Sequence, residues 1–186
     1  MRDRIVLAFL VTAAAASLVA CGGGKPSATE QWQGSLCSAV DDLVVQSEQS
    51  AQDVRSQLQS PSTATVSEIS TILDTERKAA EQTVTELKTL GPPPGQNGEK
   101  AKGLVDELAA EIEQMVTQVK QEAQTISSGS SLSEIVASIG TMADQVATST
   151  SQARGTIESL QALGMEYKNG FETVDSCKSL QKHLRK

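Results

Sequence analysis

The 186-residue chain has few of the side chains on which most catalysis and nucleic-acid recognition depend. It contains one tryptophan, one tyrosine, two phenylalanines and one histidine, and 23 acidic residues outnumber 16 basic ones, giving a net charge of −7. A nucleic-acid-binding protein needs a basic face and usually stacking rings, so a nucleic-acid partner is disfavoured. Catalysis or metal binding through paired histidines is disfavoured as well. We therefore expect no nucleic-acid partner, no metal site and no cofactor.

The N-terminus is typical of a secretory signal. After a short basic start, residues 5–20 form an uncharged apolar run that is shorter than the ~20 residues needed to span a bilayer. The run ends in Leu18-Val19-Ala20-Cys21, which resembles the lipobox of bacterial lipoproteins. This resemblance implies cleavage between Ala20 and Cys21, a lipid on the Cys21 thiol, and anchoring at the extracytoplasmic face of the cell membrane.

The chain divides into three segments on this interpretation. Residues 1–20 are the signal peptide, residues 21–30 are the lipidated cysteine with a flexible tether, and residues 31–186 are a helical domain. Glycine and proline disfavour helix in the tether. Its nine residues after Cys21 reach at most ~30 Å, so the domain is expected to stay close to the bilayer.

Apolar residues in the remaining chain recur three and four positions apart, which indicates amphipathic helices. Four such stripes run from Leu36 to Leu58, from Val66 to Leu90, from Leu104 to Ile126 and from Leu132 to Leu160. Capping residues mark the four helix starts: Ser27, Thr65, Asn97 and Ser131. Helix-breaking residues mark three ends: Pro61, the Gly91 to Pro94 run and the Ser/Gly run at 127–130. We predict an all-α fold, an antiparallel four-helix bundle with short loops.

Two cysteines remain once Cys21 carries lipid, and two cysteines outside the cytoplasm usually pair. If the last helix ran unbroken to the C-terminus, Cys177 would lie ~68 Å from the far end of the bundle, whereas Cys37 lies ~33 Å from it. Disulfide-bonded cysteines need Cα atoms within about 7 Å. A chain reversal between Gly164 and Gly170, with a helix cap at Asn169, would place Cys177 at about the same distance from the far end of the bundle as Cys37. We therefore predict a short fifth helix over about 170–185, tied to the first helix by a Cys37–Cys177 disulfide. Two free thiols on one long helix are the alternative.

The only rings after the signal segment are Trp32, Tyr167 and Phe171, and this arrangement places them together near the membrane-proximal end. They are candidates for contact with lipid headgroups or with a membrane partner. The alternative is a small core that packs the fifth helix under the disulfide.

The remaining polar residues offer little catalytic chemistry. His183 lies among basic residues near the C-terminus, which suits a cation at a helix end. Glu107 and Glu111 are four residues apart and are the candidates for a cation, but a solvated helix face explains them equally well.

The sequence favours a membrane-anchored, non-catalytic binding or scaffold module at the cell envelope, with an unidentified envelope protein as its partner. The alternative is a carrier that holds a small apolar ligand within the helical bundle. A carboxylate enzyme that uses Glu107, Glu111 and a cation is the weakest hypothesis.

Overall fold

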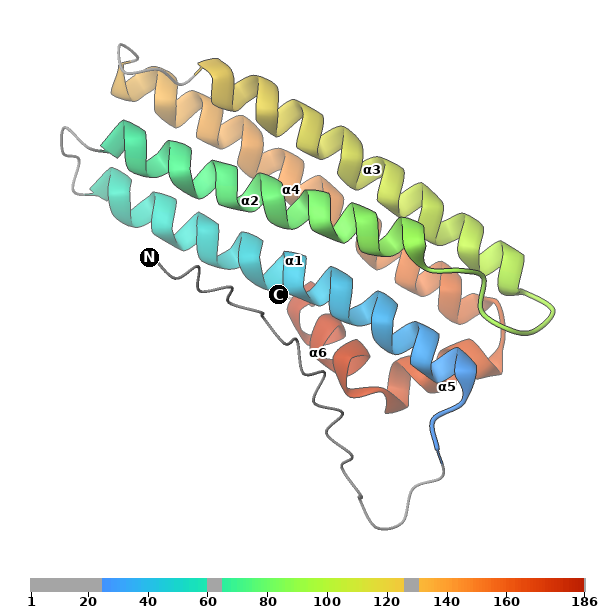
Figure 1. Ribbon diagram of the computed structural model, residues 1–186. Coiled ribbons are helices and arrows are strands. Elements are labelled where there is room, and N and C mark those ends of the chain that lie inside the picture. Colours follow the sequence, from blue (N-terminus) through green and yellow to red (C-terminus); the bar gives the residue numbers. More distant parts are fainter. Residues whose placement is uncertain (1–24, 60–64, 126–130, 186) are drawn as a thin grey trace, which may run out of the picture.

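A computed structural model describes residues 25–59, 65–125 and 131–185 of the protein, and they contain no strand (Figure 1). They form six helices: α1 (Ala28–Gln59), α2 (Thr65–Thr89), α3 (Gly98–Thr125), α4 (Leu132–Ala162), α5 (Met165–Thr173) and α6 (Asp175–Leu184). The predicted all-α class is confirmed. Helix α1 begins at Ala28, so residues 28–30, which were expected in the tether, are helical.

The long helices pack in the order in which they occur along the chain. Helix α1 packs on α2, α2 on α3, and α3 on α4, whereas α1 and α4 contact each other sparsely (Figure 1). The short helix α6 packs extensively along α1 and also touches α4. Because α6 has 10 residues and α1 has 32, α6 accompanies only part of the length of α1.

Contacts between pairs of residues give the relative directions of the helices. The Thr83 hydroxyl donates to the Ala39 carbonyl at 3.3 Å, whereas Glu76, earlier in α2, accepts from Ser50, later in α1. Helix α2 therefore runs in the opposite direction to α1. In contrast, α6 follows α1 in the same direction. Its Ser176 hydroxyl donates to the Gly34 carbonyl at 3.1 Å, and seven residues later the His183 ring meets Asp41 at 2.7 Å. The fifth helix was expected to run parallel to the first, and α6 does.

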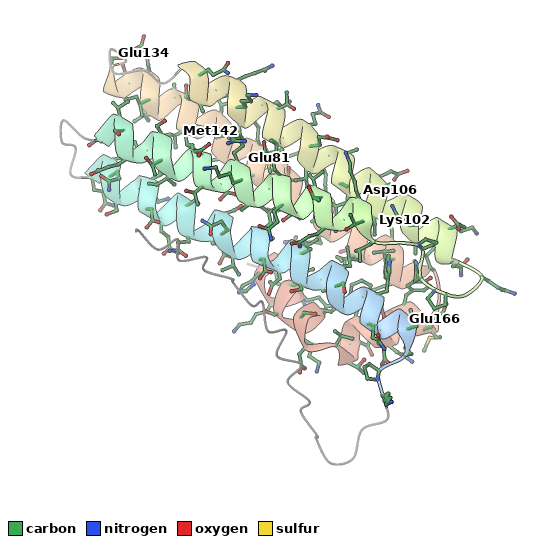
Figure 2. All side chains as sticks on the ribbon, in the orientation of Figure 1. Glu81, Lys102, Asp106, Glu134, Met142 and Glu166 are labelled. Atoms are coloured by element: carbon green, nitrogen blue, oxygen red, sulfur yellow. A yellow bond between two sulfur atoms is a disulfide. The ribbon has the colours of Figure 1, made fainter. Side chains whose placement is uncertain are left out.

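The predicted capping residues form capping boxes at the starts of α1 and α4. The Glu30 amide donates to the Ser27 hydroxyl at 3.1 Å, and the Ser27 amide donates to the Glu30 carboxylate at 2.7 Å. Ser131 and Glu134 form the same reciprocal pair at the start of α4, where Figure 2 labels Glu134. These bonds satisfy amides that have no carbonyl partner in the first turn of a helix.

Asn97 directly precedes α3, as predicted, but its side chain acts elsewhere. Its carbonyl accepts from the Ala101 amide at 2.8 Å, which is the first helical bond of α3. Its Nδ2 donates to the Leu163 carbonyl at 2.7 Å. The Asn97 side chain therefore satisfies a carbonyl at the end of α4 and ties the α2–α3 loop to that end.

The predicted single helix over about 170–185 is wrong in detail, because the chain forms two helices there. Val174 has extended backbone angles, φ −72° and ψ 126°, and separates α5 from α6. The cap predicted at Asn169 is also wrong, because Asn169 lies inside α5, which begins after Gly164. Before this break α5 contacts α1 and α4, and after it α6 packs along α1.

The predicted disulfide is confirmed. Cys37 of α1 and Cys177 of α6 are bonded, their Cα atoms are 4.9 Å apart, and 140 residues separate them in sequence. Both cysteines are fully buried within the main hydrophobic core, which the aliphatic stripes of all the long helices supply. The bond holds α6 on α1 at the end of the molecule where the chain also passes through α5.

Candidate functional site

A predominantly apolar groove lies between α1 and α4, beside the C-terminal end of α6. Its volume is about 400 Å³, within the range of about 300–1,000 Å³ that is common for small-molecule sites. On α1 it extends from Val44 to Leu58, a length of ~21 Å at the helical rise. The apolar wall is chiefly aliphatic and includes Val44, Val54, Leu73, Ile139, Met142 and Val146.

Most of the α4 side chains that line the groove are short or only half-buried. In the stretch that faces the groove, α4 presents Ala143, Ala147 and Thr150, and the larger Ile139 and Val146 are only half-buried. Nearer the disulfide, the same stripe continues in Ile157 and Leu160, which are buried. Helix α6 fills the space between α1 and α4 at that end, and the groove is the remainder of the same space.

Glu76 of α2 places a carboxyl group in the wall of this groove. The residue is 6% exposed, and both of its oxygens accept hydrogen bonds from α1. The Ser50 hydroxyl donates at 2.9 Å, and the Ser47 hydroxyl donates to the other oxygen. The Gln46 amide donates to the Ser50 hydroxyl at 3.3 Å and thereby orients it. The site therefore has one polar centre in an aliphatic surround.

The environment of Glu76 changes its titration. Burial raises the pKa of the Glu76 carboxyl, and the hydrogen bonds from Ser47 and Ser50 act in the opposite direction without cancelling that effect. A buried carboxyl beside an apolar hollow is a frequent feature of functional sites, although structural networks produce it too. Here the carboxyl contributes an acceptor that faces a space large enough for a ligand.

Charged residues surround the groove at its rim. Arg55 of α1 and Arg154 of α4 line it and are exposed. At the end occupied by α6, His183 bonds to Asp41 at 2.7 Å, and Leu184 closes the apolar wall. His183 lies in the last turn of α6, at the helix end expected from the sequence, and its ring also contacts α1.

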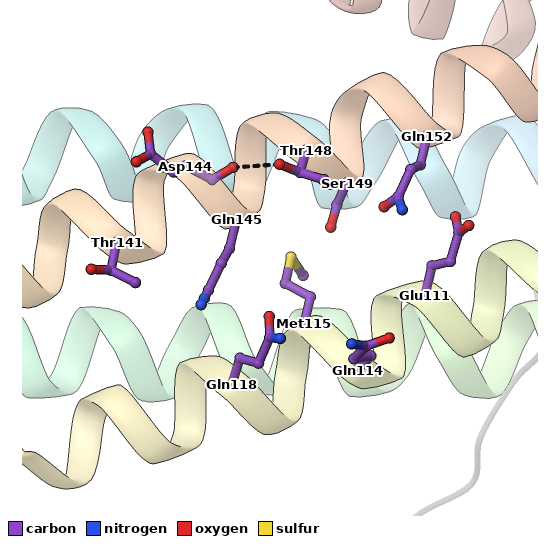
Figure 3. A pocket seen from close by; sticks show the side chains of 10 residues that line it. All are labelled: Glu111, Gln114, Met115, Gln118, Thr141, Asp144, Gln145, Thr148, Ser149 and Gln152. Carbon is purple, nitrogen blue, oxygen red and sulfur yellow. Dashed lines mark hydrogen bonds between the residues drawn. The ribbon is translucent and has the colours of Figure 1, made fainter.

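A second hollow between α3 and α4 differs in character. Its volume is about 380 Å³, and side-chain amides, hydroxyls and carboxylates line most of it (Figure 3). Figure 3 shows Gln118 and Gln145 reaching toward each other across it, with Met115 beside them. The Gln145 Oε1 atom is buried and has no hydrogen-bond partner among the described residues. This cleft contains no apolar wall comparable to that of the groove.

The candidate cation ligands do not assemble into a metal site. Glu111 lines the α3–α4 cleft, and Glu107 is exposed on α3. Among the described residues, no cluster of three or more histidine, cysteine, aspartate or glutamate side chains is arranged to hold a metal ion. The arrangement thus offers no support for the cation hypothesis.

The aromatic residues are not available for surface contact. Tyr167 and Phe171 of α5 are fully buried, and Trp32 of α1 is 8% exposed and donates its indole N–H to the Gly91 carbonyl at 2.7 Å. All three belong to the hydrophobic core, which favours the predicted alternative of a core at this end over a lipid- or partner-contacting patch. Burial raises the pKa of the Tyr167 phenol, and the nearby charge of Glu166 adds to this effect.

Sequence reasoning missed the groove and Glu76, although one signal was present. Leu73, Glu76 and Ala80 are spaced three and four apart, so Glu76 occupies a position of the α2 stripe where an apolar residue is expected. A charged residue at such a position predicts either a buried polar network or a site. The width of the space between α1 and α4 carries no comparable sequence signal.

The proposed lipid attachment at Cys21 and the cleavage site after Ala20 lie outside the described residues. None of the described helices is both long enough and apolar enough to cross a membrane. No family model, curated protein or solved structure matches the chain.

Proposed function

We propose that the protein is a lipid-anchored, extracytoplasmic binding protein that holds an apolar ligand in the groove between α1 and α4. The observation that carries this proposal is the groove itself, an aliphatic hollow of about 400 Å³ with a single buried carboxyl in its wall. Ligand sites of this size commonly combine an apolar lining with a few placed polar groups. Binding in this way requires no catalytic step and no cofactor.

The groove follows from an incomplete helical bundle. We propose that α1 to α4 form an antiparallel four-helix bundle that is open along the α1–α4 edge, with α6 inserted at one end. The sparse contacts between α1 and α4, and the contacts of α6 with both, support this arrangement. In a closed bundle, side chains of α1 and α4 would fill the space that the groove occupies.

Anchoring remains a proposal that rests on the lipobox-like sequence ending in Cys21. The groove starts about 16 residues into α1, so it lies ~24 Å along the helix from Ala28, where the tether joins the domain. A lipid on Cys21 would thus hold the groove near the bilayer, outside the cytoplasmic membrane. The envelope protein partner expected from the sequence stays a prediction, since the groove favours a small ligand instead.

The test uses the secreted chain from Gly22 onward, because the core residues and the disulfide lie within the described residues from Trp32 onward. Decan-1-ol and dodecan-1-ol are titrated below their aggregation concentrations, and thermal melting is followed. A ligand at 100 times its Kd stabilises the folded state by about 2.7 kcal/mol, so a clear rise in Tm is expected.

A blocking variant locates the binding. Ala147 lines the groove and is exposed, so Ala147→Trp fills the hollow without replacing a buried side chain. Ala137, which is also exposed on α4 but does not line the groove, provides the matched control Ala137→Trp. Loss of the Tm rise in Ala147→Trp alone supports the proposal. An absence of any rise in the unmodified protein, or equal rises in both variants, would refute it.

A further inference from the structure

We infer that the groove selects a cationic amphiphile, an alkyl chain that carries an ammonium group, and that the Glu76 carboxylate receives this group. The inference rests on the proposed function and specifies the chemistry of the ligand. It follows from three features: the position of Glu76 in the groove, the hydrogen bonds that orient its carboxylate, and the distribution of charge around the hollow.

Glu76 lies where a polar head can meet it while a chain stays in apolar surroundings. Its serine partners are at positions 47 and 50, between the two ends of the groove at Val44 and Leu58. From Ser50 to Leu58 the α1 wall continues for ~12 Å, with Val54 between them. An alkyl chain can therefore extend along this wall with its head group beside the carboxylate.

The hydrogen bonds show which kind of head group fits. Ser47 and Ser50 both donate to Glu76, and the Ser50 hydroxyl in turn accepts from Gln46. The Glu76 oxygens thus act as acceptors, and each carboxylate oxygen has capacity for a further donor. An ammonium group supplies three donors and a positive charge, whereas a carboxylate or phosphate head supplies neither.

The charges around the groove differ in their exposure to solvent. Glu76 is buried, whereas Arg55 and Arg154 are exposed at the rim, and exposed ion pairs contribute little because water and salt screen them. The other titratable groups that line the groove are Glu48 and His183, and His183 is bonded to Asp41. An anionic head at an arginine would leave the Glu76 carboxylate covered by the alkyl chain without a compensating charge, which is unfavourable.

The experiment compares three probes with the same chain length: decylammonium, decan-1-ol and decanoate. Each is titrated into the secreted chain from Gly22 onward by calorimetry at neutral pH and below its aggregation concentration. We expect decylammonium to bind at least tenfold more tightly than decan-1-ol, and decanoate to bind most weakly. In Glu76→Gln the preference for decylammonium over decan-1-ol is expected to disappear while decan-1-ol still binds. The matched control is Glu86→Gln, which removes one charge from an exposed position of α2 outside the groove and should keep the preference.

A second measurement avoids any change in sequence. Lowering the pH protonates Glu76 but leaves decylammonium charged and decan-1-ol neutral, so the ratio of their affinities should fall toward one in the wild-type protein. Tighter binding of decanoate than of decylammonium, or a preference that Glu76→Gln and acid both leave unchanged, would overturn the inference while leaving the proposed function intact. If none of the three probes binds, the proposed function fails, and this inference fails with it.

Discussion

The Cys37–Cys177 disulfide makes the stability of the fold open to a quantitative test. The bond closes a loop with a sequence separation of 140 residues. On a chain-entropy model, a loop of this length lowers the entropy of the unfolded chain enough to stabilise the folded state by about 5 kcal/mol. Total stabilities of domains are about 5–15 kcal/mol, so the bond is a major part of the whole. Replacing both cysteines, Cys37→Ser and Cys177→Ser, should therefore lower the free energy of unfolding by about 4–5 kcal/mol.

The assay is urea unfolding followed by far-UV circular dichroism. Two buried serines introduce polar groups into the core and add their own cost, so the wild-type protein unfolded with and without a reductant provides the control. The double variant should lose at least as much as the reduced wild type, because only the variant carries the cost of the two buried serines. Both sulfur atoms belong to fully buried residues, so reduction of the folded protein should be slow. A loss of less than about 1 kcal/mol in both comparisons would contradict this prediction, because it would mean that closing this loop hardly restricts the unfolded chain.

Three further predictions concern single positions. In Gly170→Ala, the new Cβ would lie 1.7 Å from the Gln33 Oε1 atom and would displace the buried Gln33 amide that donates to the Tyr167 carbonyl, so we expect a loss of about 1–3 kcal/mol in urea unfolding. Burial raises the pKa of Glu76, so the folded state binds the proton of this carboxyl more tightly than the unfolded state does. The contribution of the carboxyl to stability is therefore fully present at low pH and is lost as pH rises from 4.5 through the pKa in the folded state. The stability of Glu76→Gln relative to wild type should accordingly be greater at pH 7 than at pH 4, and an equal difference at both would contradict this. Ser131→Ala removes the cap of α4 and should lower Tm, with a cost of about 1 kcal/mol.

The helical fold could be predicted because its signals are local. Amphipathic stripes and capping boxes depend on residues within a few positions of one another, and Ser27 with Glu30 and Ser131 with Glu134 form the bonds that their spacing predicts. The disulfide could be predicted for a different reason. The positions of the two cysteines along the helices allow them to meet only if the chain reverses before the second cysteine.

The break at Val174 could not be predicted in the same way. Valine is neither a turn residue nor a common helix terminator, so no local signal marks its extended conformation. Asn97 is a similar case, because its side chain bonds to Leu163, which is 66 residues away in sequence. A partner so far away leaves no local pattern in the sequence.

The groove escaped prediction because it is a property of the distance between two helices. Small residues such as Ala143 and Ala147 permit either close packing or an open space, and the sequence does not distinguish the two. Glu76 was the one local indication, a carboxyl at a stripe position of α2. The aromatic residues left two interpretations open for a different reason, since rings near one end of a helical domain suit an interface and a core equally well.

Crystallography with a brominated probe can show whether the space between α1 and α4 binds an apolar chain. Crystals of the secreted chain from Gly22 onward, grown with 10-bromodecan-1-ol, would locate the bromine by anomalous scattering. We expect an anomalous peak within the groove, between the aliphatic side chains of α1 and those of α4 such as Val54 and Ile139. A peak only in the polar α3–α4 cleft, or a fully occupied probe elsewhere with the groove closed by side chains, would contradict it.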